Sequence, residues 1–268
     1  MTDALAVDIP DQADQLYQPR LAEMIAGVLR SRIVEGEIAD GARLPKQDEL
    51  LREFRVSRPS LREALRILEA EGLLVVKRGN VGGAVVRAPN AQSSARSFGL
   101  VLQSRHVVVE DLAEAIRNVE PVAAMLCARR KDRRRTVIPR LRAAQESVEA
   151  SIGDGAVFTS TARQFHEELV RACGNETIAV MLGTFEAMWS EQEKQWARWA
   201  ESRGSYPAAK AQKEVLAAHQ ALLRSIELGD EEHAARLARS HLDKSQRYTL
   251  AEAHGAVVQA PPMRGTAT

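Results

Sequence analysis

The order of elements in residues 44–86 constrains the fold more than any other feature of the chain. The pattern predicts a short helix over 46–53, a tight turn, and a second helix over 58–71. Ser57 is a good N-cap for the second helix, and Gly72 suits its end. Two β-branched runs around a glycine-containing loop then predict a hairpin, with strands at 73–77 and 84–87. This order is typical of a winged helix-turn-helix, which places its second helix in a DNA major groove.

Three arginines follow one face of the second predicted helix. Arg58, Arg62 and Arg66 recur every four residues, opposite a leucine-rich face, so one side packs while the other presents guanidinium groups. Guanidinium groups bind phosphates and pair bidentately with guanine. Each arginine alone would suit an ordinary solvated helix, but the combination predicts binding to double-stranded DNA. The complete set of expected DNA contacts is Lys46, Ser57, Arg58, Ser60, Arg62, Arg66, Asn80 and Gly82.

The rest of the chain predicts a mostly α protein with two domains. A helix over 20–35 precedes the winged segment, and everything after Ser94 has helical periodicity with glycine-rich breaks and no strand pattern. The helices are expected at 94–104, 109–130, 134–152, 156–173, 176–201, 207–228 and 230–252. The expected organisation is a disordered tail (1–15), a winged helix-turn-helix (16–88), a linker (89–94), an all-helical domain (95–252) and a second tail (253–268).

Composition limits where such a chain works. The net charge is +1, as in an ordinary globular protein. Only two cysteines occur, and this low number favours a reducing cytoplasm over an oxidising compartment. No run of eighteen apolar residues is present, so a membrane partner is not expected.

Three histidines lie on the inward faces of three different predicted helices. His166, His219 and His241 each interrupt an apolar stripe, whereas the other histidines occupy polar or terminal positions. One such histidine is usually a core residue, but three in one bundle suit a metal site for Zn²⁺ or Ni²⁺. Arg117, one step off an apolar stripe, is a candidate clamp for a carboxylate, with a surface salt bridge as the alternative. The expected effector contacts are therefore Arg117, His166, His219 and His241.

Residues 17–87 resemble the DNA-binding domain of GntR-type transcription regulators. The matching residues are Leu44-Pro45, Glu49-Leu50, Val56-Ser57-Arg58, Leu61-Arg62-Glu63-Ala64-Leu65 and Glu71-Gly72-Leu73. The resemblance implies that Arg58 and Arg62 contact operator DNA. The family often has Glu-Arg where this chain has Gln47-Asp48, which implies a different operator preference.

Residues 94–250 resemble the helical FCD ligand domain of the FadR subfamily. The similarity lies in Asp111-Leu112, Glu120-Pro121, Phe165-His166, Gly174-Asn175, and the spacing of 22 residues between His219 and His241. Many members hold a metal with an aspartate and three histidines, and a small carboxylate effector completes the shell. The three histidines match, but Ala162 stands at the position of the aspartate.

These observations together predict a cytoplasmic, ligand-responsive transcription regulator, most often a repressor in the resembled family. It would bind a palindromic operator as a homodimer and sense a small carboxylate or fatty-acid-like metabolite. One rival is a metal-dependent hydrolase using the three histidines, although the sequence offers no convincing general base. Another is a protein that binds DNA without a ligand, which a filled helical bundle would favour. No catalytic residue is expected in the preferred interpretation.

Overall fold

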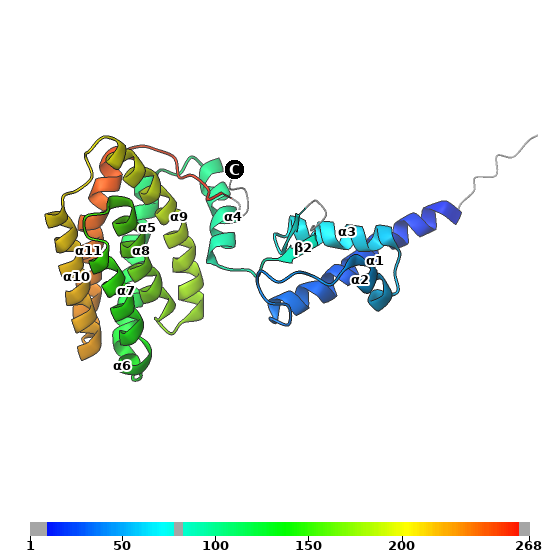
Figure 1. Cartoon of the computed structure of the whole chain (residues 1–268), viewed down its shortest axis with the longest axis horizontal. Coiled ribbons are helices and arrows are strands. Elements are labelled where there is room, and N and C mark those ends of the chain that lie inside the picture. The colour runs from blue at the N-terminus through cyan, green and yellow to red at the C-terminus, as the bar shows by residue number, and fades with distance from the viewer. Residues whose placement is uncertain (1–9, 78–82, 263–268) are drawn as a thin grey trace, which may run out of the picture. The chain divides into compact units, whose positions relative to one another are not determined.

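The computed structural model divides into two compact units, residues 1–89 and 90–268 (Figure 1). The structure describes the chain apart from residues 1–9, 78–82 and 263–268. Within the described residues, no helix is long and apolar enough to cross a membrane. The mostly helical fold with one β-hairpin confirms the predicted fold class.

The first unit is a winged helix-turn-helix. It contains α1 (Pro10–Val34), α2 (Gln47–Phe54), α3 (Arg58–Ala70), β1 (Leu74–Lys77) and β2 (Gly83–Val86). The strands pair antiparallel in the register Leu74↔Val86, and residues 42–44 add hydrogen bonds to β2 that the sequence did not indicate. Apolar side chains from α1, α3 and the wing form one core that includes Leu29, Leu61 and Leu68, all fully buried.

The expected local signals position α3. The Ser57 side chain accepts a hydrogen bond from the Ser60 backbone N–H, and Pro59 lies in the first turn. Gly72 adopts a φ of 76°, a left-handed conformation that glycine reaches without strain and that turns the chain into β1.

The second unit is a bundle of eight helices among the described residues. Its elements are α4 (Ala91–Ser104), α5 (Val109–Arg129), α6 (Arg133–Thr136), α7 (Ile138–Ala150), α8 (Gly155–Arg171), α9 (Glu176–Ser202), α10 (Ala209–Leu228) and α11 (Glu231–Glu252). α5 packs against α11 and α8 packs against α9, and the core between them contains Phe165, Leu169 and Leu182.

Several expected boundaries differ from the structure, among them the linker expected at 89–94, most of which is helical because Asn90 caps α4 at Ala91. α1 begins at Pro10 rather than Arg20, because the apolar stripe starts later than the helical backbone and proline suits a first helical turn. The expected helix over 134–152 is divided into α6 and α7, and Pro139 lies at the start of α7, where its missing N–H is tolerated.

The expected C-terminal tail is also shorter than the sequence suggested. Gly255 turns the chain with a φ of 70°, and Val257 then forms an antiparallel bridge with Val108. Val258 is fully buried, and the Pro261 carbonyl accepts a hydrogen bond from Arg96 at 3.0 Å. Residues 256–261, here called the C-terminal segment, therefore pack against the helical unit because two adjacent valines supply an apolar anchor.

Candidate functional site

The α3 surface presents the predicted arginine face. Arg58, Arg62 and Arg66 are all exposed, while Leu61, Ala64 and Leu68 on the opposite side are fully buried. Lys46 and Ser57 are exposed as well.

Ser60 does not fit a DNA contact. Its side chain is 3% exposed and its hydroxyl lies 3.0 Å from that of Ser57, so it supports the helix start instead. Asn80 and Gly82, expected at the tip of the wing, lie outside the described residues.

Asp48 acquires a role that the sequence did not suggest. Its carboxylate lies 3.2 Å from Nη2 of Arg58, and both side chains are exposed. The acidic residue at this position therefore pairs with one of the predicted DNA-contacting arginines.

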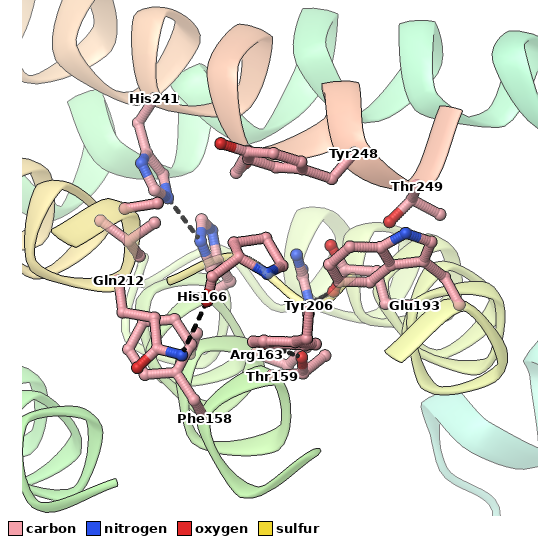
Figure 2. Close-up of a pocket in the computed structure, with 16 residues that line it drawn as sticks. Phe158, Thr159, Arg163, His166, Glu193, Tyr206, Gln212, His241, Tyr248 and Thr249 are labelled. Atoms are coloured by element: carbon pink, nitrogen blue, oxygen red, sulfur yellow. Dashed lines mark hydrogen bonds and ion pairs between the residues drawn. The ribbon is translucent and has the colours of Figure 1, made fainter. Parts of the chain in front are cut away.

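The second candidate site is a cavity of about 80 Å³ in the helical unit. α8, α9, α10, α11 and the loop before α10 contribute its lining, which includes His166, His241, Arg163, Glu193 and Trp196. Figure 2 shows His166 and His241 on one side of this cavity and Tyr206 and Glu193 on the other.

The three predicted histidines converge beside the cavity. His166, His219 and His241 are buried, and their ligand nitrogens lie within 4.8 Å of one another. Nε2 of His241 is 3.2 Å from Nε2 of His166 and 3.1 Å from Nε2 of His219. Nitrogens bound to one tetrahedral Zn²⁺ at about 2.0–2.1 Å would be about 3.3 Å apart, so the observed separations fit a shared metal ion.

The protonation states of His219 and His241 also suit a metal. Burial lowers the pKa of His241 to about 3, and it lowers the pKa of His219 well below its usual value. Both imidazoles are therefore neutral near pH 7, as a metal ligand must be.

Glu120 holds one histidine of this cluster from behind. Its carboxylate is fully buried and lies 2.5 Å from Nδ1 of His166. Burial raises the pKa of Glu120, the interaction with the neighbouring His166 lowers it, and the net shift is downward. A carboxylate on the far nitrogen fixes the ring orientation and leaves Nε2 to face a metal, an arrangement common in metal sites.

The fourth ligand of the resembled family is absent. Ala162 lines the cavity one turn before His166, where a methyl group cannot coordinate. The position it would have filled is open to the cavity, where His166 and His241 belong to the lining and His219 is buried behind them.

Arg117 does not reach the cavity. Its guanidinium donates to Gln246 at 2.8 Å and lies 3.6 Å from Asp243, so the structure favours the salt-bridge alternative, with a partner on α11. Its expected role as an effector clamp is therefore a wrong assignment, because a residue one step off the stripe lies at the edge of the α5–α11 contact.

Arg163 is the cavity residue that sequence reasoning missed. It is 5% exposed and forms ion pairs with Glu186 and Glu193 of α9, the one to Glu193 at 3.4 Å. The signal was its spacing of three residues before His166, which places both side chains on one face of α8.

Comparison with known proteins agrees with both units. Residues 21–85 match the family of bacterial regulatory proteins described as gntR, and residues 111–244 match the FCD domain. The Uxu operon transcriptional regulator of Escherichia coli is 27% identical over 84% of this chain and 85% of its own length. The transcriptional repressor NanR of Klebsiella aerogenes is 41% identical over 64 residues, which span 24% of this chain and 25% of that repressor.

A solved structure supports the fold. The structure of Streptococcus agalactiae GntR aligns with a TM-score of 0.59 and 22% identity, over 84% of this chain and 99% of that one. The FCD match alone covers half of the chain. The chain therefore belongs to the GntR family of transcription regulators, in the FadR subfamily that carries an FCD domain, and it is a regulator rather than an enzyme.

Proposed function

We propose that the chain is a cytoplasmic repressor that binds a palindromic operator as a homodimer and responds to a small carboxylic acid. The exposed arginine face of α3 supports operator contacts by Arg58, Arg62 and Arg66, with Lys46 and Ser57 nearby. The similarity to NanR, a protein named as a transcriptional repressor, supports repression. Effector binding weakens operator binding if the effector prefers the conformer that does not bind DNA.

The convergence of three histidine nitrogens beside a cavity carries the sensing part of the proposal. His166, His219 and His241 would hold Zn²⁺ or Ni²⁺, with Glu120 orienting His166. A bound metal ion would supply a positive charge that attracts an acidic group. Because Ala162 leaves one coordination position open, the effector carboxylate has room beside the histidines.

The size of the cavity narrows the effector class. A volume of about 80 Å³ accommodates a molecule of a few heavy atoms. A fatty acyl chain needs a long tunnel, whereas this cavity is short, and its mainly apolar lining also includes the polar residues Thr159, Gln212, Ser245 and Thr249. We therefore favour a small polar acid over a fatty acid. A cavity with convergent polar groups also argues against a DNA-binding protein that needs no ligand.

Exposed apolar side chains support the dimer. Phe98, Leu100 and Val101 of α4 are 43%, 49% and 52% exposed. Val180 and Met181 of α9, which packs against α4, are also exposed. Clusters of exposed apolar residues of this kind often mark protein interfaces.

Metal loading tests the sensor site. We expect Zn²⁺ or Ni²⁺ to raise the melting temperature of the chelator-stripped protein, because an ion that binds only the folded state stabilises it. His219→Ala should abolish the shift. His233→Ala, which removes an exposed histidine on α11, is the matched control and should keep it.

A gel shift with the promoter DNA of the chain's own operon tests the regulatory part. The metal-loaded protein should bind this DNA, and small acids should release it. Binding of an acid with no change in operator affinity would contradict the proposed response.

A further inference from the structure

Buried carboxylates outnumber buried cations around the cavity. Glu120, Glu186 and Glu193 are 0%, 1% and 8% exposed, and Arg163 is the buried guanidinium among them. Glu120 pairs with His166, and the closest partner of Arg163 is Glu186. Glu193 therefore shares the Arg163 guanidinium with Glu186 and has no second cationic partner among the described residues. A buried carboxylate is costly unless a cation or several hydrogen bonds compensate it.

Glu193 faces the cavity with free hydrogen-bonding capacity. It belongs to the lining, whereas Glu186 and Glu120 do not. Within the part of the chain that the structure describes, the Nε of Arg163 at 3.4 Å is its one ion-pair partner, and no hydrogen bond to its carboxylate is formed. A ligand in the cavity can therefore donate to this carboxylate.

Three aromatic side chains surround the same end of the cavity. The ring of Trp196 lies 5.4 Å from that of Tyr206 and 6.1 Å from that of Tyr248, measured between centroids. The Tyr206 hydroxyl lies 2.7 Å from that of Thr159, and burial raises the pKa of Tyr206 to about 12, so this phenol stays neutral. Neutral aromatic rings beside a carboxylate favour a cationic group.

A metal on the histidines does not neutralise Glu193 by coordination. The group of ligand atoms within 4.8 Å of one another contains the three histidines and not Glu193. The two ends of the cavity therefore have different chemistry: imidazoles at one end, and at the other the Glu193 carboxylate with its ion-pair partner Arg163 and the aromatic rings (Figure 2).

We propose that the effector carries an ammonium group, which Glu193 recognises against the wall of Trp196, Tyr206 and Tyr248. The inference rests on the proposed function for the acidic end of the ligand, which would lie toward the histidines. A molecule with both groups and the size of this cavity is a small amino acid or an amino-substituted acid of similar size.

Matched pairs of acids that differ only in an amino or hydroxyl group test the proposal. Calorimetry on the zinc-loaded full chain would compare L-alanine with L-lactate, L-serine with L-glycerate, and L-aspartate with L-malate. In the pair that fits best, the amino compound should bind at least about tenfold more tightly, because an ammonium group makes a charge-assisted hydrogen bond to Glu193 and a hydroxyl group makes a neutral one.

Variants assign the preference to Glu193. Glu193→Gln should bring the ratio within a pair close to one, while the affinity for the hydroxy acid changes little. Glu191→Gln, two residues earlier on α9 and outside the lining, is the matched control and should keep the ratio.

Each outcome decides the question. Equal or tighter binding of the hydroxy acids by the unmodified protein would overturn the ammonium proposal and leave acid sensing intact. If neither member of any pair binds the folded, zinc-loaded protein, both the ammonium proposal and the small-acid function are wrong. The comparison within pairs uses the unmodified chain, so it stands even if Glu193→Gln fails to fold.

Discussion

Replacing Arg163 with methionine tests the buried ion pairs that join α8 to α9. The change keeps an unbranched side chain but removes the charge that faces Glu186 and Glu193. Removing one partner of a buried ion pair typically costs about 3–5 kcal/mol, because the remaining charge stays buried without compensation.

An unpaired buried carboxylate can escape its charge by taking up a proton. The cost of that protonation is therefore an upper limit on the stability lost per carboxylate. A glutamate with an ordinary pKa of about 4.3 can be protonated at pH 7 for about 3.7 kcal/mol, at 1.36 kcal/mol per pKa unit. Glu186 is 1% exposed, so it should approach this limit, while Glu193 can still hydrogen-bond to water in the cavity. We therefore expect Arg163→Met to lower the free energy of unfolding by about 3–4 kcal/mol at pH 7.

The stability lost in Arg163→Met should become smaller as the pH falls. Without Arg163, the buried Glu186 carboxylate would have no cation beside it, and taking up a proton would remove this cost, so the folded variant should bind more protons than the unfolded chain as the pH falls. The variant therefore regains stability relative to the original chain as the pH falls, and the limit per carboxylate at pH 5.5 is only about 1.6 kcal/mol.

Tryptophan fluorescence during urea unfolding measures this effect. All three tryptophans, Trp189, Trp196 and Trp199, lie on α9, so the signal follows the helical unit and not the winged unit. Arg171→Met removes an exposed arginine from the same helix and should cost less than about 0.5 kcal/mol. Adding Glu186→Gln to Arg163→Met should recover part of the loss. A loss below about 1 kcal/mol, or one that does not change with pH, would refute the reasoning.

Three further outcomes are expected. Arg62→Ala should weaken operator binding by about 1–3 kcal/mol in a gel shift. The control Arg247→Ala, which removes an exposed arginine of α11, should have no effect. Equal affinities for the two variants would exclude Arg62 from the DNA contact. In the metal-free protein, burial lowers the folded-state pKa of His241 to about 3, so the unfolded state binds more protons below pH 6.5. The free energy of unfolding should then fall with decreasing pH from about 6.5, by up to about 1.4 kcal/mol per pH unit for this group, and urea titrations from pH 7 to 5 that show no decrease would count against a neutral buried His241. Gly99→Ala should destabilise the helical unit by about 1–3 kcal/mol, since a Cβ there would lie 2.9 Å from the Ala260 Cα; the same substitution in a chain ending at residue 255 should lose this penalty, and an equal cost in both chains would argue against the contact.

Periodicity predicted the features that each helix carries by itself. His166, His219 and His241 interrupt apolar stripes, and a helix turns its whole stripe toward the core, so their burial followed from spacing alone. The α3 arginines were predictable for the same reason, because they occupy the face opposite the leucines.

Features that depend on pairing between helices were not predictable in this way. Arg163, Glu186 and Glu193 lie on inward faces, but nothing in the spacing of α8 shows which residues of α9 will meet it. Arg117 was assigned wrongly because a residue at the edge of a stripe can turn toward either side, and here Gln246 and Asp243 of α11 hold it.

The C-terminal segment returns to the first helix of its own domain. Val258 donates to the Val107 carbonyl at 2.9 Å, and Arg96 on α4 holds Pro261. α4 begins at Ala91, immediately after the residues that close the winged unit. A dye attached to a cysteine introduced at the exposed position 262 would therefore lie close to α4 and would report its movement.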